Sequence, residues 1–249
     1  MTPPQIRVLP TPDALAQAAA ERVVDAARRN TERNGTFSLT LSGGSTPKAL
    51  YTLLASDHYR GQIDWPEVEI FFGDERTVPP DHPDSNYRMA HQALLSKVPI
   101  KPGNIHRMRG EINPEQAAKE YGQLLKERFG DDGGPDLVLL GIGEDGHTAS
   151  LFPHSPALKE TRHRCVANPV AKLKTTRLTM TAPFVNRARE VDVLAAGAGK
   201  AKVLHEVLEG PDDPERLPIQ MIQPKSANLL YLLDAAAAGM HEDDEAIER

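Results

Sequence analysis

Short apolar runs alternate with longer amphipathic segments along the chain. Strand-like runs occupy residues 6–9, 37–41, 68–72, 136–140, 164–170, 178–181, 191–196 and 229–232. Helix-like amphipathic segments occupy residues 12–30, 47–54, 86–97, 113–129 and 200–208. Strands that alternate with helices are typical of parallel sheets, because a crossover helix brings the chain back before the next parallel strand begins. The pattern therefore predicts an α/β fold, an open, mostly parallel sheet with helices on both faces.

Local signals mark the ends of some of these elements and the limits of the domain. Thr11 is the predicted N-cap of the first helix, and Gly35 follows its end. No segment has the composition of a linker, so residues 1–249 are expected to form one domain, with 97–132 as a candidate small subdomain. The acidic tail, residues 241–249, is expected to be frayed or a solvated helix end.

Composition and charge exclude several classes of protein. The 249 residues contain 29 Lys and Arg against 35 Asp and Glu, and the net charge of -6 argues against a nucleic-acid partner. No apolar run approaches the ~18 residues of a membrane span, and the N-terminus has no apolar signal-peptide core. The single cysteine, Cys165, excludes an internal disulfide and is interpreted as a small buried hydrophobic residue. A cytoplasmic protein without nucleic-acid or membrane partners is expected.

Three glycine-containing polar loops each follow a predicted strand, the place where open parallel sheets bind ligands. The first loop is Ser42, Gly43, Gly44, Ser45 and Thr46, immediately before a helix. Glycines allow a ligand to approach the backbone closely, and the N–H groups of a helix N-terminus attract anions. The loop is therefore a candidate phosphate cradle, although it lacks the spacing of a P-loop. The alternative interpretation is a turn with a Ser/Thr helix cap.

The second loop and two later cations extend this candidate anion site. Asp74 and Glu75 stand beside Arg76, whose guanidinium can hold an oxyanion or a phosphate. The alternative is that these three charges only pair with one another. Arg177 directly precedes a predicted strand, and Lys200 follows two glycines at the start of a predicted helix. Together with the first loop, Arg177 and Lys200 would complete a cage for one phosphate.

The third loop, residues 141–153, carries the strongest catalytic signal. It places His147 after a glycine at the end of a buried strand, and histidine is the side chain best suited to proton transfer near neutral pH. Asp145, two residues earlier, can orient the ring. Glu144 and Glu75 are the bases to consider if His147 plays no part. A metal site is the competing interpretation, but no residues here have a recognised metal-ligand spacing, so no metal is expected.

Four stretches, in this order, match those of a known family: SGGSTPKALY, FFGDERTVPPDHPDSNYRMA, PDLVLLGIGEDGHTASLFP and RLTMTAPFVNRAREVDVLAAGAGKA. From about residue 37 to 209 the chain resembles the glucosamine-6-phosphate isomerase/6-phosphogluconolactonase family, on its lactonase side. The resemblance implies a fold related to glucosamine-6-phosphate deaminase and ribose-5-phosphate isomerase. It also implies hydrolysis of 6-phospho-D-glucono-1,5-lactone to 6-phospho-D-gluconate in the oxidative pentose phosphate pathway, without a cofactor.

The candidate residues suit the reaction that the resemblance implies. His147 would take a proton from the water that attacks the lactone carbonyl, and Asp145 would orient its ring. Arg76 would either stabilise the oxyanion or bind the substrate, two roles that the sequence does not separate. The first loop, Arg177 and Lys200 would hold the phosphate. The expected partner is thus a small sugar-phosphate lactone, and the chain is expected to be a monomer or a small homo-oligomer.

Two other functions stay open at this point. A deaminase/isomerase-like enzyme shares the phosphate loop, but its motif resembles DGHxAxNEP, with a carboxylate where this chain has Phe152. That carboxylate would help to move protons between sugar carbons, so Phe152 favours hydrolysis. The other alternative is a sugar-phosphate sensor. It would normally carry a further DNA-binding segment of ~50–60 residues, for which the chain has no room, and it would not need His147.

Overall fold

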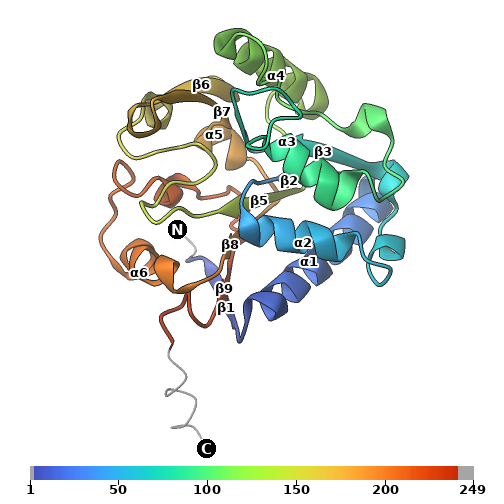
Figure 1. Cartoon of the computed structure of the whole chain (residues 1–249), viewed down its shortest axis with the longest axis horizontal. Helices are drawn as coiled ribbons and strands as arrows, with labels where there is room; N and C mark the ends of the chain where they lie inside the picture. Colours follow the sequence, from blue (N-terminus) through green and yellow to red (C-terminus); the bar gives the residue numbers. More distant parts are fainter. Residues whose placement is uncertain (1–2, 241–249) are drawn as a thin grey trace, which may run out of the picture.

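The computed structural model describes residues 3–240, which form two sheets flanked by helices (Figure 1). The acidic tail, residues 241–249, lies outside the described residues. The larger sheet has six strands in the order β1-β9-β8-β5-β2-β3, and all neighbouring strands are parallel. These strands are β1 (Gln5–Leu9), β2 (Phe37–Leu41), β3 (Val68–Phe72), β5 (Leu137–Gly141), β8 (Glu190–Ala195) and β9 (Leu229–Asp234). The predicted parallel sheet is confirmed.

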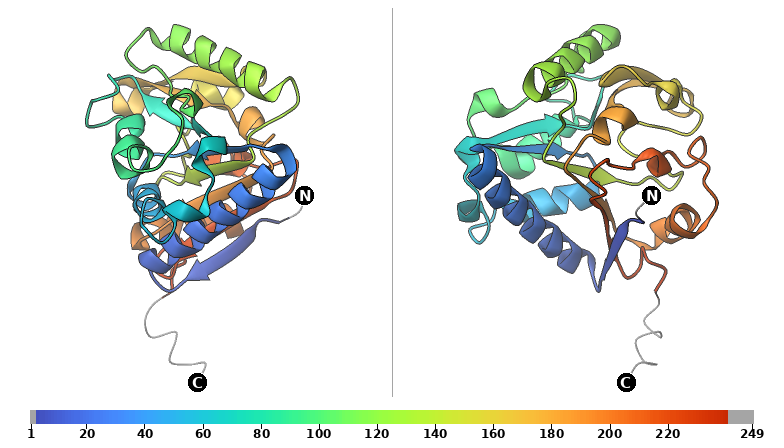
Figure 2. Two further views of the ribbon diagram at one scale, coloured as in Figure 1. Left: turned by 90° about the vertical axis from the view of Figure 1, so that its right-hand side faces the viewer. Right: turned by 180° about the vertical axis from the view of Figure 1, so that it is seen from behind.

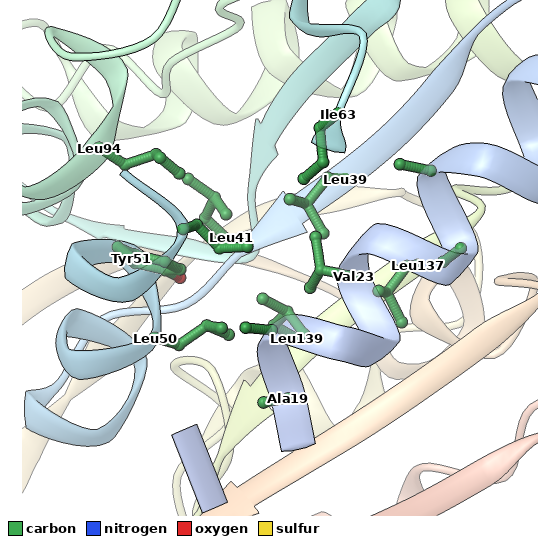
Figure 3. Close-up of a cluster of buried hydrophobic side chains, with 14 of the residues drawn as sticks. Ala19, Val23, Leu39, Leu41, Leu50, Tyr51, Ile63, Leu94, Leu137 and Leu139 are labelled. Atoms are coloured by element: carbon green, nitrogen blue, oxygen red, sulfur yellow. The ribbon is translucent and has the colours of Figure 1, made fainter. Parts of the chain in front are cut away.

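Helices cover both faces of this sheet, as predicted. They are α1 (Pro12–Asn34), α2 (Ser45–Leu54), α3 (Asn86–Ala90), α4 (Pro114–Phe129), α5 (Ala182–Val185) and α6 (Ala201–Glu209). In β5, Leu137 and Leu139 pack in one core cluster with α1 and α2, whereas Val138 and Leu140 pack in another with α4, α5 and α6. Alternate residues of a strand point to opposite faces, so β5 is buried on both. Figure 2 shows α1 along one face, and Figure 3 shows its side chains turned toward Leu137 and Leu139.

The helix boundaries follow local side-chain and backbone chemistry. The Thr11 side chain accepts a hydrogen bond from a first-turn N–H group, and Gly35 ends α1 with a φ of 76°, so both predicted boundary residues are confirmed. The helix predicted over 86–97 is confirmed over 86–95, but only Asn86–Ala90 is α-helical, and His91–Leu95 continues it as a π-helical turn. Hydrophobic spacing does not distinguish these two kinds of turn. In the described range, no helix is long and apolar enough to cross a membrane.

A second sheet of three antiparallel strands lies beside the first, in the order β4-β7-β6. Its strands are β4 (Asp74–Arg76), β6 (Cys165–Val170) and β7 (Thr175–Met180). The prediction that residues 73–76 form a loop is wrong, because Asp74–Arg76 pairs with β7. Charged residues give no hydrophobic strand pattern, so only the pairing defines this strand. The prediction of a buried side chain at Cys165 is confirmed.

Residues 97–132, the candidate subdomain, contain α4, which packs against β6 and β7 near the top of Figure 1. The buried face of this helix includes Ala117 and Leu125. The Tyr121 hydroxyl accepts the backbone N–H of Phe72 at 2.8 Å, at the end of β3. α4 is therefore tied both to the small sheet and to the edge of the large one.

Candidate active site

The 42–46 loop, β4 and the 141–153 loop meet at the carboxyl edge of the parallel sheet, because β2, β3 and β5, which precede them, are neighbours in the sheet. Contacts between the loops then fix their positions. The Asn86 amide donates to the Asp74 carboxylate at 3.0 Å and lies so close to Gly43 that a side chain at Gly43 would overlap it. Ser150, three residues after His147, donates to Asp74 at 2.6 Å. Asp74 thus contacts the histidine loop directly and the 42–46 loop through Asn86.

The imidazole of His147 is held by three neighbours. Its Nδ1 lies 2.5 Å from Oδ1 of Asp145. The Phe152 ring stacks on it with the ring centroids 4.3 Å apart, and a side chain at Gly143 would overlap it. Because Nδ1 is engaged by the carboxylate, Nε2 is the nitrogen available for proton transfer. This is the geometry that the predicted orientation of His147 by Asp145 requires.

The Asp145 carboxylate is held in its charged form. Burial acts to raise its pKa, but the hydrogen bond from His147 and the ammonium group of Lys172 outweigh burial and lower the pKa to about 2. Lys172 Nζ lies 3.1 Å from Oδ2 of Asp145. Sequence reasoning missed Lys172, since it lies in the turn between β6 and β7 and only the path of that hairpin brings it to the histidine loop.

Two arginines face each other on the small sheet, and neither forms an ion pair with a residue of the range 3–240. Arg76 on β4 and Arg177 on β7 are directly opposite in the antiparallel register. The Nε–H group of each is buried and has no hydrogen-bond partner among residues 3–240. Arg76 donates through another nitrogen to the Asp84 carbonyl, while burial and the charge of Arg76 lower the pKa of Arg177. Like charges that face each other repel, so an anion between the two guanidiniums would satisfy both.

The carboxylates of β4 anchor the neighbouring loop rather than pair with the Arg76 guanidinium. Glu75 is only 2% exposed. Its carboxylate accepts three backbone N–H groups at 2.8 Å each, those of Arg76, Asn86 and Tyr87. Burial nevertheless raises the pKa of Glu75. These bonds fasten the start of α3 to β4 and so shape the loop 77–85, which makes Glu75 a structural residue.

The 42–46 loop leads into α2 through a glycine with a positive φ. Gly44 precedes α2 with a φ of 109°, which favours glycine, and no side chain caps the helix, so the Ser/Thr-cap interpretation is wrong. The helix begins at Ser45, two residues before its predicted start at Pro47. Because no N-cap side chain accepts from its first-turn N–H groups, they are available to an anion.

Lys200 lies at the same edge, between β8 and α6. It ends a short 3-10 turn over Ala198–Lys200. Glu144 of the histidine loop approaches this turn: its Oε1 lies 3.0 Å from the point that a Cβ on Gly199 would occupy. The turn and the histidine loop are therefore in contact. The phosphate cage that includes both Lys200 and Arg177 stays a prediction.

Among the described residues, neither Cys165 nor a metal site is part of this arrangement. Cys165 is buried, and burial raises the pKa of its thiol to about 12, which makes it a poor nucleophile. Across residues 3–240, no three His, Cys, Asp or Glu side chains are grouped so that they could hold a metal ion.

Comparison with known proteins gives consistent matches over nearly the whole chain. Residues 10–231 match the family model of glucosamine-6-phosphate isomerases/6-phosphogluconolactonase. A 6-phosphogluconolactonase of Synechocystis sp. is 43% identical over 240 residues, which cover 94% of this chain and 97% of that protein. The rat 6-phosphogluconolactonase is 39% identical over 243 residues, which cover 95% of this chain and 93% of that one.

Solved structures agree with these matches. The 6-phosphogluconolactonase of Trypanosoma brucei superposes with a TM-score of 0.84 at 31% identity, covering 96% of this chain and 99% of that one. A monomeric glucosamine-6-phosphate deaminase superposes with a TM-score of 0.82 and covers 95% of this chain, but at 22% identity it shows a shared fold only. The predicted relation to the deaminase fold is confirmed.

Proposed function

Because this chain belongs to the glucosamine-6-phosphate isomerase/6-phosphogluconolactonase family, we propose that it hydrolyses 6-phospho-D-glucono-1,5-lactone to 6-phospho-D-gluconate. This reaction is the second step of the oxidative pentose phosphate pathway. The observation that carries the proposal is the facing pair Arg76 and Arg177, whose buried Nε–H groups have no partner among the described residues, at the edge that also holds His147 and Asp145. Hydrolysis of a phosphorylated lactone needs both an anion site and a proton acceptor.

In the proposed reaction His147 acts as a general base. Its Nε2 takes a proton from water while the water oxygen attacks the lactone carbonyl carbon, and the carbonyl oxygen becomes an oxyanion. When this tetrahedral intermediate collapses, the bond between that carbon and the ring oxygen breaks. His147 then returns the proton to the departing ring oxygen. Asp145 stays charged, orients the ring and stabilises the imidazolium.

We assign both facing arginines to the phosphate, because the phosphate is the only full negative charge on the substrate. A pair of guanidiniums can share one such group through several charge-assisted hydrogen bonds. Because Arg76 lies opposite Arg177 in the strand register, we assign Arg76 to substrate binding rather than to oxyanion stabilisation. The first-turn N–H groups of α2 and the ammonium group of Lys200 would complete the cradle.

Phe152 favours hydrolysis over the deaminase/isomerase-like alternative. It stacks on the His147 imidazole, at the position where the deaminase motif has a carboxylate. An apolar ring cannot supply the second proton-transfer group that moving protons between sugar carbons requires. A sugar-phosphate sensor is the non-enzymatic alternative, and it would have no use for the His147–Asp145 pair.

The proposal is tested with purified protein and freshly prepared 6-phosphogluconolactone, with the spontaneous opening of the lactone subtracted. Glucono-1,5-lactone is the control, because it lacks only the phosphate. We expect catalysed hydrolysis with a strong preference for the phosphorylated substrate. Equal rates on the two lactones would contradict the phosphate assignment of the arginines. Binding without turnover would support the sensor, and release of ammonia from glucosamine 6-phosphate would support the deaminase.

The ligand, the location and the oligomeric state of the protein are part of the same proposal. The ligand is a small sugar-phosphate lactone, as the family implies. The chain works in the cytoplasm as a monomer or small homo-oligomer, without a cofactor. These features stay predictions, and sedimentation of the purified protein would determine the assembly.

A further inference from the structure

A lysine outside the residues assigned so far contacts the His147–Asp145 pair. Lys172 Nζ lies 3.1 Å from Oδ2 of Asp145, and the other oxygen of that carboxylate lies 2.5 Å from His147 Nδ1. The carboxylate is therefore shared between an imidazole and an ammonium group. Because each oxygen has its own partner, the carboxylate cannot rotate without losing one of them.

The hairpin of β6 and β7 delivers Lys172 to this position. Its turn is a short 3-10 segment, Ala171–Leu173, and it closes at Lys174, which adopts the left-handed conformation with a φ of 50°. β7 follows and carries Arg177. One hairpin therefore supplies both a member of the arginine pair and the cation that contacts Asp145.

Other charged groups near Asp145 balance one another. A cavity of about 360 Å³ beside it is lined by four further charged side chains, Glu144, Lys202, Glu206 and Arg216. Glu206 and Arg216 form an ion pair at 2.5 Å, and the remaining two carry opposite charges. Among residues 3–240, Lys172 is the only lysine or arginine that forms an ion pair with Asp145. The charge next to the carboxylate therefore depends on Lys172.

We propose that Lys172 is a positioning residue for the general base, a role that rests on the proposed function. It holds the Asp145 carboxylate so that Oδ1 stays on His147 Nδ1, and this keeps Nε2 directed at the attacking water. It also offsets part of the negative charge beside the imidazole.

Removing the ammonium group of Lys172 should lower kcat and shift the pH dependence of kcat/KM, but it should leave substrate binding unchanged. A carboxylate held at one oxygen orients the imidazole less rigidly, so kcat should fall about three- to tenfold. The uncompensated carboxylate should also move the acid limb of kcat/KM up by about half a pH unit, a modest shift because Lys172 is 72% exposed and screened by solvent. KM should change less than about twofold, as expected when ground-state binding is intact.

The test compares Lys172→Met with Lys174→Met in the full chain. Both lysines are exposed in the same turn, but Lys174 forms no ion pair with a described residue, so its substitution controls for the lost charge. We expect only Lys172→Met to shift the acid limb and lower kcat, and Lys172→Arg to restore both. High salt should move the wild-type limb toward that of Lys172→Met, because salt screens an exposed pair.

The outcomes separate this inference from the function on which it rests. If the wild-type protein does not hydrolyse the lactone, the proposed function is wrong. If the wild-type protein is active and the pH profiles of Lys172→Met and Lys174→Met are identical, only the positioning role of Lys172 is wrong. A rise in KM with an unmoved acid limb also overturns it, because Lys172 would then bind substrate. The ring titration of His147, followed by NMR in the same proteins, gives the same comparison without turnover.

Discussion

Strand β5 of the large sheet buries only apolar side chains, whereas the β6–β7 hairpin of the small sheet buries polar side chains as well as apolar ones. In the large sheet the buried residues of β5 are all apolar, and Leu139 is fully buried. The small sheet buries polar groups just as deeply, since Asn168 on β6 and Thr179 on β7 are also fully buried. An apolar side chain is stabilised wherever it is covered, whereas a buried polar group is stable only with its partners in place. The apolar core around β5 therefore serves as the frame of the fold, and the β6–β7 hairpin specifies where the loops lie.

Asn168 shows how the small sheet positions the catalytic loop. Its Nδ2 donates to the Ser150 carbonyl at 2.8 Å and to the Ser155 hydroxyl at 2.9 Å. Its Oδ1 accepts the Ala157 N–H at 3.2 Å. These bonds hold the segment that directly follows His147. The contrast predicts that damage to the large sheet reduces stability, while damage to the small sheet reduces binding and catalysis.

The largest effect is expected from a cavity in the large sheet. Leu139 packs against α1 and α2, so Leu139→Ala should lower the free energy of unfolding by about 2–5 kcal/mol (Figure 3). Urea denaturation measures this loss, and kcat per folded molecule should stay near the wild-type value. A stable variant with a low kcat would contradict the role of this sheet as a frame.

Arg177→Met should separate binding from stability. Losing one charge-assisted contact of about 1.5–3 kcal/mol should weaken binding of 6-phosphogluconate roughly 10- to 150-fold by calorimetry. The melting temperature of the free protein should rise, because burial and Arg76 disfavour the charge on Arg177. Arg28→Met, an exposed arginine of α1, is the control. Unchanged product affinity, or a lower melting temperature, would argue against an anion site here.

Asn168→Ala tests whether the small sheet positions the histidine loop, and its expected effect is smaller. It leaves three buried or partly buried groups without their partner, which should cost about 1–3 kcal/mol of stability. The released segment should also lower kcat about tenfold while KM changes little. Chemical denaturation and steady-state kinetics on one preparation measure both. If stability falls and kcat does not, Asn168 supports the fold without positioning the histidine loop.

The smallest effect is the pH dependence of stability at Asp145. The pKa of Asp145 in the folded protein is about 2, below the ordinary 3.8, because its bonds to His147 and Lys172 outweigh burial. The carboxylate therefore contributes stability above pH 3.8, and this contribution is lost as the pH falls through about 2. Screening of this partly exposed group reduces it to about 1 kcal/mol. Asp145→Asn should be less stable than wild type near neutral pH, and the difference should vanish in strong acid. A pH-independent difference would contradict this linkage.

The large sheet was predictable from the sequence because burial on both faces requires continuous apolar runs. The observed bounds of β2 and β3, Phe37–Leu41 and Val68–Phe72, are those predicted. The small sheet was only partly predictable, since β4 consists of Asp74, Glu75 and Arg76 and becomes a strand by pairing with β7. Its stability comes from partners that lie far away in the sequence, and no local pattern encodes them.

The candidate site divides in the same way. Loop position and residue type pointed to His147, Asp145 and both arginines as candidates. That Arg76 lies opposite Arg177 follows from the register of β4 and β7, which short motifs do not specify. Lys172 belongs to the same class, because its contact with Asp145 depends on the path of the β6–β7 turn.

The central claim, that this edge performs general-base hydrolysis through His147, is tested most directly on one sample of His147→Ala. kcat, 6-phosphogluconate affinity and melting temperature are measured together. We predict a kcat about 10²–10⁴-fold lower, the usual contribution of a positioned base, with product affinity and melting temperature close to wild type. A variant that melts early but hydrolyses the lactone at a near wild-type kcat would contradict the account and leave Glu144 as the next base to test.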